Sequence, residues 1–154
     1  MVAHELYRLA HALRHRWRMW RGTPLSGVSI IAQDWEGRLL LMRHSYGPNG
    51  WHLPGGGISR RETPQDAAVR ELREETGCRA EGVRAVGTLD EVISGSPHTA
   101  HLFGCFTNDQ PVPDGREVVE ARFFPLHSLP EPLGERTRAR LEAWREFERA
   151  SQQR

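Results

Sequence analysis

Three glutamates near the middle of the chain, Glu71, Glu74 and Glu75, have the spacing that brings side chains together on a helix. Residues three and four apart project from nearly the same helix face. Pro64 is typical of a first helical turn and Gly77 of a helix end, so we expect a helix from about Pro64 to Thr76. Carboxylates on one face repel one another and weaken an isolated helix. A hard divalent cation, which prefers oxygen ligands, would relieve that repulsion.

Glutamate-rich helices with interleaved arginine are also common on solvated surfaces, where they form weak ion pairs. For the segment 70–75 alone, a solvated surface is the more frequent interpretation. The wider pattern argues against it, because Gly56, Glu62 and Gly77 stand at fixed distances from the glutamates. With average residue usage, chance rarely fills so many fixed positions at once.

The stretch from Gly56 to Cys78 resembles the Nudix box, the signature of the Nudix hydrolases, written GX5EX7REUXEEXGU with U an apolar residue. Every fixed position is filled, namely by Gly56, Glu62, Arg70, Glu71, Leu72, Glu74, Glu75, Gly77 and Cys78. Cys78 is a mild departure, because Ile, Leu or Val is usual at that position. The resemblance implies an α/β protein with the Nudix fold, a mixed β-sheet sandwiched between α-helices.

The resemblance also implies a hydrolase that depends on Mg²⁺, with Mn²⁺ as a substitute, and cleaves the pyrophosphate bond of a nucleoside diphosphate linked to another moiety. A Mg²⁺ cluster polarises phosphoryl oxygens and lowers the pKa of bound water. The expected metal residues are Gly56, Glu62, Glu71, Glu74 and Glu75. The expected catalytic residues are Arg70, Glu71, Glu74, Glu75 and Glu117. We expect Arg70 to orient a glutamate through a bidentate ion pair rather than to touch substrate.

The sequence leaves the general base and the substrate open. Candidates for the base are Glu71 within the box, Glu117 and then Glu120 outside it, and last the pair Asp90 and Glu91. Family members that act on ADP-ribose often carry a proline about sixteen residues past the box, and those that act on diadenosine polyphosphates a tyrosine about eighteen past it. Serine occupies both positions, 94 and 96, so neither substrate class is supported.

The loop at 45–50 and the glycines that follow are expected to border the substrate. The candidates for substrate contact are Tyr46, His52, Gly55 and Gly57, and Trp51 is equally expected in the core. Glycines allow the backbone to approach closely and to adopt positive φ, so this loop can fold over the helix that carries the glutamates.

Length and composition predict one domain with a sizeable core. The 154 residues carry a net charge of +1, which gives no argument for a nucleic-acid partner. All 21 basic residues are arginine, which suggests a GC-rich bacterial source, and Cys78 and Cys105 lie in apolar surroundings typical of free buried thiols. No targeting segment or membrane span is apparent, so a cytoplasmic location is expected.

Residues 1–21 are expected to form a basic amphipathic helix, followed by a Nudix domain over 22–154. An apolar stripe of leucine and tryptophan predicts packing on the domain or on a second subunit, so a homodimer is left open. Contact with a membrane or a phosphate-rich partner is the alternative. Further predicted elements are a hairpin with strands at 27–32 and 38–43, strands at 51–53, 79–92, 99–107 and 117–124, a glycine turn at 55–57 and a second helix at 134–149. In the last strand, Val119, Ala121 and Phe123 alternate with Val118, Glu120 and Arg122, so each set is expected to share one face.

Two other functions compete with the small-molecule hydrolase. One is a nucleotide-sensing module that retains the fold without catalysis, but its metal glutamates would be expected to erode, and here all are present. The other is an RNA 5′-end pyrophosphohydrolase, with the basic N-terminal segment as an electrostatic guide. The nearly balanced charge makes this second alternative weaker.

Overall fold

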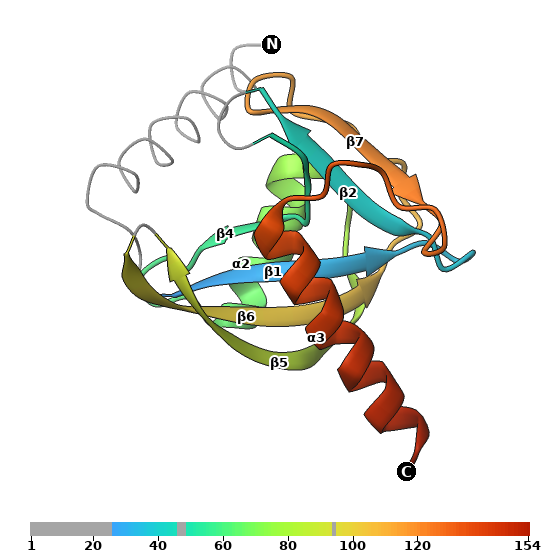
Figure 1. Ribbon diagram of the computed structural model, residues 1–154. Helices are drawn as coiled ribbons and strands as arrows, with labels where there is room; N and C mark the ends of the chain where they lie inside the picture. Colours follow the sequence, from blue (N-terminus) through green and yellow to red (C-terminus); the bar gives the residue numbers. More distant parts are fainter. Residues whose placement is uncertain (1–25, 46–48, 94) are drawn as a thin grey trace.

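The computed structural model describes residues 26–45, 49–93 and 95–154 (Figure 1). Its elements in chain order are β1 (Ser26–Gln33), β2 (Leu39–His44), β3 (Trp51–His52), β4 (Gly55–Gly57), α2 (Pro64–Thr76), β5 (Glu81–Ile93), β6 (Ser96–Phe106), β7 (Val118–Phe124) and α3 (Glu135–Gln152). The predicted helix over residues 1–21 and the candidate residue Tyr46 lie outside the described residues.

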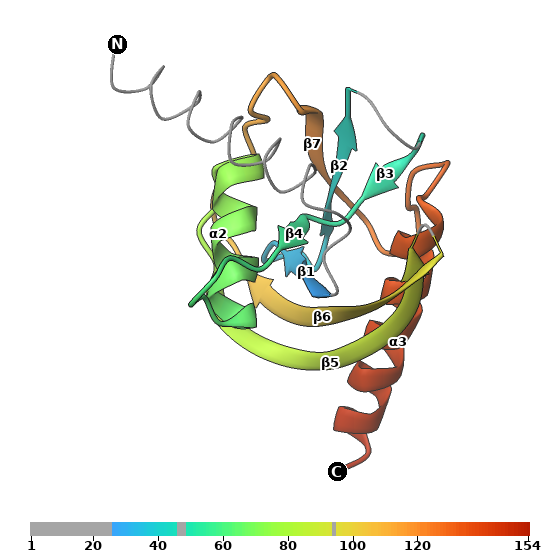
Figure 2. The same cartoon turned by 90° about the vertical axis from the view of Figure 1, so that its left-hand side faces the viewer.

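The strands form one mixed sheet with α2 on one face and α3 on the other (Figures 1 and 2). The strand order is β3-β2-β1-β6-β5, with β4 paired to β1 and β7 paired to β2. The long pairing between β1 and β6 is parallel, whereas β5 and β6 form an antiparallel hairpin. The predicted α/β fold, a mixed sheet between helices, is confirmed.

An apolar core lies on each face of the sheet. Ile30 and Met42 belong to the core under α2, and their neighbours Ile31 and Leu41 belong to the core under α3. Strands buried on both faces have continuous apolar sequences rather than alternating ones. This explains the largely apolar sequences of β1 and β2, which hold the two helices at opposite sides of the same sheet.

The hairpin predicted over 27–43 forms only at its base. β1 and β2 share one register pair, Gln33 with Leu39. Along the rest of their lengths the two strands have other partners. β1 pairs with β4 and β6, and β2 pairs with β3 and β7. The predicted glycine turn at 55–57 is itself strand β4, and it pairs with the opening residues of β1.

Strand β7 departs from the predicted alternation because its register shifts. Arg43 pairs with Glu120 but His44 pairs with Val118, so Val119 has no partner on β2. An extra residue of this kind is a β-bulge, and it changes which side chains face the core. Val118 is therefore buried and Val119 is 42% exposed, although the sequence analysis grouped Val119 with Ala121 as one face.

Both helices follow their sequence signals. Helix α2 begins at Pro64, with Thr63 accepting a hydrogen bond from the Asp66 N–H at 3.1 Å. It ends at Gly77, whose φ of 74° is the left-handed conformation that glycine adopts without strain. Helix α3 buries Leu141 and Trp144 against the opposite face of the sheet. Among the described residues, no helix has the length and apolar character needed to cross a membrane.

Candidate functional site

Strand β4 and helix α2 meet along two glycines and two glutamates. Glu71 and Glu75 are 6% and 8% exposed, and the Gly55 N–H donates to Glu75 Oε1 at 2.9 Å. A Cβ atom at Gly56 would lie 2.6 Å from Glu71 Oε1, a distance that real Cβ contacts do not reach. The glycine strand can therefore approach the two carboxylates only because it has no side chains there.

Arg70 connects Glu62 to two of the helix glutamates. Its Nε and Nη2 donate to the two oxygens of Glu62 at 2.7 and 2.9 Å, which is the bidentate geometry expected from the sequence. Its Nη1 donates to Glu71 at 2.9 Å and to Glu74 at 3.1 Å. Its Nη2 also donates to the Gly57 carbonyl at 3.0 Å. We call Arg70, Glu62, Glu71 and Glu74 the Arg70 cluster; the carboxylates in it raise the pKa of Arg70.

Glu75 carries a carboxyl group whose ionisation is opposed by its surroundings. Burial is the main cause that raises the pKa of Glu75 well above its ordinary value, and the negative charge of Glu71 adds to it. The charges of Asp114 and Glu117 raise the same pKa, whereas the hydrogen bond from Gly55 lowers it. Glu117, placed far from the box in the sequence, therefore lies near enough to Glu75 to interact electrostatically with it.

Asp114 was not among the site residues predicted from the sequence. Its Oδ1 accepts hydrogen bonds from the backbone N–H groups of residues 116, 117 and 118, at 2.8 to 3.0 Å. These bonds fix the turn that leads into β7, and Ser45 N donates to the Glu117 carbonyl at 2.9 Å from the other side. The signal for this turn was the Asp114-Gly115 pair, because aspartate accepts from the backbone N–H groups that follow it.

The donor chemistry around Glu75 fits a magnesium ion. In the described part of the chain, no three Asp, Glu, His or Cys side chains are gathered as a ready-made metal site. Mg²⁺ does not require three, because it keeps several waters and takes one or two protein carboxylates. A cation beside Glu75 would favour the charged form that burial and neighbouring carboxylates now oppose. Glu75 and Glu71 are the side chains that would hold it.

His44 lies near Glu117, whose charge acts on it, and His52 lies next to His44. The rings of His44 and His52 are 5.5 Å apart, at the ends of the paired strands β2 and β3. Burial lowers the pKa of His44, with a further contribution from His52. His52 packs against Gly134, where a Cβ atom would lie 2.6 Å from the ring. Trp51 is 8% exposed and belongs to the core under α3, in agreement with the core alternative.

The remaining candidates for the general base have other partners. Glu120 forms an ion pair with Arg43, and Asp90 accepts a hydrogen bond from Thr99 Oγ1 at 3.2 Å. Glu91 is held by Arg140 on α3, on the face of the sheet opposite α2. Glu71 and Glu117 are the candidates whose negative charges raise the pKa of Glu75.

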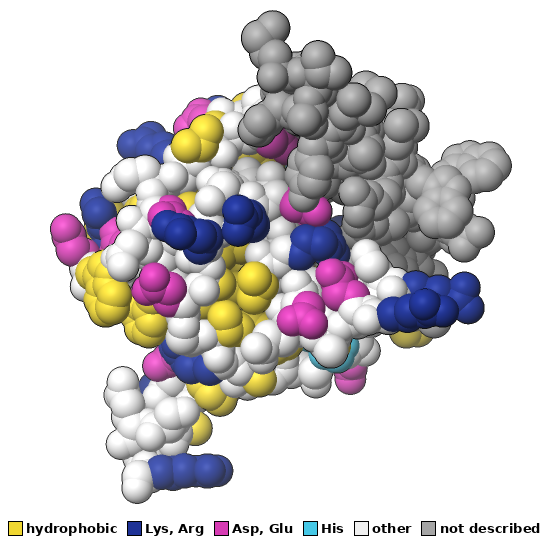
Figure 3. Space-filling model, turned by 180° about the vertical axis from the view of Figure 1, so that it is seen from behind, with side chains coloured by type: hydrophobic (Ala, Val, Ile, Leu, Met, Phe, Trp, Pro, Cys, Tyr) yellow, Lys and Arg dark blue, Asp and Glu magenta, His cyan; other side chains and the backbone are white. Residues whose placement is uncertain are grey.

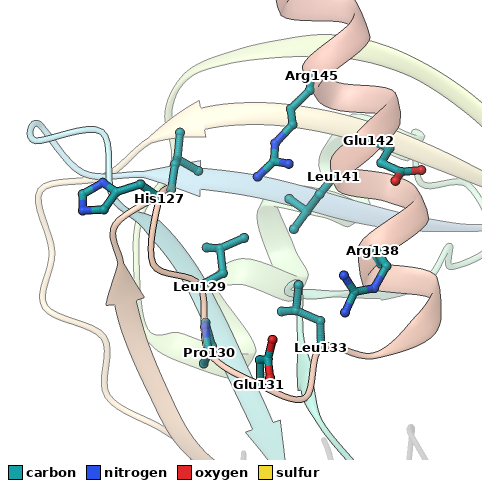
Figure 4. A pocket seen from close by; sticks show the side chains of 10 residues that line it. His127, Leu129, Pro130, Glu131, Leu133, Arg138, Leu141, Glu142 and Arg145 are labelled. Atoms are coloured by element: carbon teal, nitrogen blue, oxygen red, sulfur yellow. The ribbon is translucent and has the colours of Figure 1, made fainter.

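A cavity of about 210 Å³ lies elsewhere, between α3 and the segment that follows β7 (Figure 4). Its lining combines Leu129, Leu133 and Leu141 with Arg138 and Arg145, and it contains no residue of the box. Seen from the α2 side, charged side chains of both signs are interspersed over the surface (Figure 3). Because no residue of the box lines this cavity, the α2–β4 region is the candidate site.

Cys78 and Cys105 are free and buried, as expected from their apolar surroundings. Burial raises the pKa of both thiols, that of Cys105 to about 12. A thiol that stays protonated at neutral pH is a poor nucleophile. We therefore assign the cysteines to the core under α2, where both belong to the same apolar cluster.

Comparisons with known proteins agree with this fold and site. A family model described as NUDIX domain matches residues 23–144. Among solved structures, a MutT NUDIX hydrolase from Burkholderia pseudomallei superimposes with a TM-score of 0.71 at 26% identity, over 79% of this chain and 98% of that one.

Two curated relatives match parts of the chain. A CMP-5′-(N-acetyl-N-hydroxy-3-aminopropyl)phosphonate hydrolase from Streptomyces rubellomurinus is 37% identical over an alignment of 110 residues, which covers 68% of this chain and 53% of the relative. An RNA pyrophosphohydrolase from Saccharophagus degradans is 47% identical over 55 residues, 35% of this chain and 32% of the relative. The chain thus spans about half the length of the first relative and about a third of the second. Because the family model covers most of the chain, and the box residues meet where the fold places them, the chain belongs to the NUDIX domain family.

Proposed function

We propose that this chain is a Mg²⁺-dependent pyrophosphohydrolase that cleaves the phosphoanhydride bond of a nucleoside diphosphate linked to another moiety. The observation that carries the proposal is the buried Glu75, held by the Gly55 N–H beside Glu71 and opposed in its ionisation by neighbouring carboxylates. Such a carboxylate is costly unless a cation or a function offsets it.

Each residue has a role that follows from its contacts. When bound, Mg²⁺ would supply charge neutralisation on the phosphate oxygens and a water of lowered pKa. Glu71 and Glu75 would ligate the ion, and Glu74 and Glu62 would support it. Arg70 orients Glu62, Glu71 and Glu74 through its four hydrogen bonds to them. Gly55 and Gly57 would present backbone groups to the phosphates.

Glu117 and Glu71 are the proposed acceptors of the proton from the attacking water. A general base must lie within hydrogen-bond reach of that water, directly or through one more water. Both charges act on Glu75, and the Asp114 turn fixes the backbone of Glu117. His44 lies near Glu117 and next to His52, so these two histidines would contact the leaving group or its phosphate.

The test is a hydrolysis screen paired with a metal-binding measurement. The panel contains nucleotide sugars, dinucleotides, nucleoside triphosphates, oxidised triphosphates, a CMP-linked phosphonate and 5′-triphosphorylated RNA, each with and without Mg²⁺. We expect metal-dependent turnover of at least one substrate. We also expect Mg²⁺ or Mn²⁺ to raise the melting temperature of the wild type and to raise that of Glu75→Gln much less.

Two outcomes would overturn this proposal. Unchanged Mg²⁺-dependent turnover in Glu75→Gln would remove Glu75 from the reaction. Nucleotide binding in a thermal-shift assay, without turnover in Mg²⁺ or Mn²⁺, would favour the non-catalytic sensing module instead.

An RNA 5′ end is the second candidate substrate, because several relatives are named RNA pyrophosphohydrolase. If residues 1–21 guide RNA electrostatically, their deletion should impair RNA turnover far more than turnover of a free nucleotide, and more so at low salt. Equal loss on both substrates, or no loss, would count against RNA.

A further inference from the structure

A second arginine–glutamate pair lies on the opposite face of the sheet. Arg140 on α3 donates from Nε and Nη2 to the two oxygens of Glu91 on β5, at 3.0 and 2.8 Å. Its Nη1 donates to Ser29 Oγ on β1 at 2.7 Å. We call Arg140, Glu91 and Ser29 the Arg140 cluster. Its three members are 16%, 9% and 1% exposed.

His98 also lies beside Glu91, but it is not the cation that balances the charge of this carboxylate. Its Nδ1 lies 3.4 Å from Glu91 Oε2 but makes no hydrogen bond with the described residues. Burial lowers the pKa of His98, so the ring is neutral at neutral pH. Arg140 is therefore the cation that balances Glu91, and its third donor is available to hold Ser29.

Ser29 transmits this contact to the glycine strand. Ser29 pairs with Gly55 in the antiparallel register of β1 and β4. A Cβ atom at Gly55 would lie 2.1 Å from the Val28 carbonyl oxygen and 3.1 Å from Ser29 Oγ. Gly55 is thus the strand partner of the serine whose hydroxyl Arg140 holds, and a side chain at Gly55 would meet that hydroxyl.

Gly55 in turn holds Glu75. Its N–H donates to Glu75 Oε1 at 2.9 Å, and this hydrogen bond favours the charged form of the carboxylate. Arg140, Ser29, Gly55 and Glu75 therefore form a continuous series of contacts that crosses the sheet from α3 to α2. Each link is a hydrogen bond or a close packing contact.

We propose that Arg140 is a positioning residue for Glu75, acting through Ser29 and Gly55. This inference rests on the proposed role of Glu75 as a metal ligand. Arg140 does not touch the site itself; it fixes the place of the backbone N–H that orients the ligand. Removing a residue that orients a metal ligand without binding the metal commonly lowers metal affinity by about 10- to 100-fold.

The chain provides a matched control in Arg84 on β5. Arg84 forms an ion pair with Glu148 on α3, so it also ties β5 to α3, but the pair lies away from Ser29 and is more exposed. The variants are Arg140→Met, Ser29→Ala and Arg84→Met. Ser29→Ala removes one oxygen and leaves the Arg140–Glu91 pair in place, so it tests the same series if Arg140→Met fails to fold.

Two measurements report on the contacts. Amide hydrogen exchange at Gly55, followed by NMR in the metal-free protein, reads the Gly55–Glu75 hydrogen bond directly. Mn²⁺ titration by calorimetry reads the affinity of the site. We expect Arg140→Met and Ser29→Ala to speed exchange at Gly55 and to weaken Mn²⁺ binding by about tenfold. Arg84→Met should leave both quantities within about twofold of wild type, by the same scale.

The inference is overturned if Gly55 exchange and Mn²⁺ affinity stay at wild-type values in Arg140→Met or, should that variant not fold, in Ser29→Ala. It is also overturned if Arg84→Met changes both by the same factor, since the effect would then be general loosening of α3. Failure of the proposed function has a different signature, namely no Mn²⁺ binding by the wild type.

Discussion

Two arginines on opposite faces of one sheet hold glutamates in different ways. Arg140 faces a single carboxylate, Glu91, and its third nitrogen donates to a serine hydroxyl. Arg70 contacts three carboxylates at once, those of Glu62, Glu71 and Glu74, and a fourth glutamate, Glu75, lies beside them with a raised pKa. Around Arg140 one positive charge faces one carboxylate, whereas around Arg70 four carboxylates lie close together.

The contrast indicates what each cluster is for. A one-to-one buried pair in which each of the three guanidinium nitrogens makes a hydrogen bond is a structural tie between elements, here α3, β5 and β1. Concentrated carboxylates oppose one another's ionisation, and proteins keep such arrangements where a function repays the cost. We therefore read the Arg140 cluster as a brace and the α2–β4 region as a cation site. The following variants test that reading.

The largest expected difference is between Glu75→Gln and Glu91→Gln. Glu75→Gln should lower metal-dependent turnover by about 10³-fold, because a ligand of the catalytic ion is lost. Glu91→Gln should instead lower the free energy of unfolding by about 2 kcal/mol, because Arg140 loses its charged partner. Steady-state kinetics and urea unfolding of both variants provide the comparison. A loss of turnover in Glu91→Gln as large as that in Glu75→Gln would remove the distinction between the two faces.

Glu117→Gln and Glu120→Gln separate the candidates for the general base. The charge of Glu117 acts on Glu75, whereas Glu120 is paired with Arg43 across β2 and β7. If Glu117 is the base, its variant should lose about 100-fold in kcat with little change in KM, and Glu120→Gln should retain nearly full activity. Equal, small effects in both variants would leave Glu71 as the base.

The neighbouring glycines should respond differently to the same substitution. The Cβ of Gly56→Ala would meet the Glu71 carboxylate, the end of a side chain that can move. We expect about tenfold weaker Mn²⁺ binding with modest loss of stability. The Cβ of Gly55→Ala would meet the Val28 carbonyl, which belongs to the backbone of β1, so we expect a loss of about 3 kcal/mol in unfolding free energy. Calorimetric titration and thermal unfolding distinguish the two, and a reversed ranking would contradict this geometry.

The smallest effect concerns stability against pH in the metal-free protein. The pKa of Glu75 is raised in the folded state, so folding is favoured when this carboxyl is protonated. Its contribution is present below its ordinary pKa and is lost as the pH rises through the raised value. Glu75→Gln should therefore become more stable than wild type as the pH rises, by about 1 kcal/mol near pH 8. Parallel urea titrations measure this difference, and saturating Mg²⁺ should abolish or reverse it.

Much of the site was predictable because its residues are close in the sequence. Helix α2 has the predicted bounds, since Pro64 and Gly77 are local signals that act without the rest of the fold. A bidentate pair between Arg70 and a glutamate was also expected, and Glu62, in the loop just before the helix, is that partner. Strands were predicted at 27–32 and 38–43, where β1 and β2 lie.

Contacts between distant segments were not predictable in the same way. The β-bulge at Val119 depends on the register of β7 against β2, and a shift of one residue reverses which side chains face the core. The expected hairpin was mostly replaced because β6, about seventy residues later, pairs in parallel along β1. Register and strand partners are set by the packed sheet, and no local signal carries them.

The sequence by itself determined the family, the glutamate helix and the position of the glycines before it, because each is specified by residue type at fixed short spacing. Only the tertiary structure placed Asp114 and Glu117 beside Glu75, and Arg140 behind it. These residues come from a turn and a helix far along the chain, and their distance from Glu75 depends on how the sheet brings α3, β7 and β4 together. The charges that act on Glu75 and the contacts behind Gly55 therefore depend on the packed sheet, whereas the box motif can be recognised in the sequence alone.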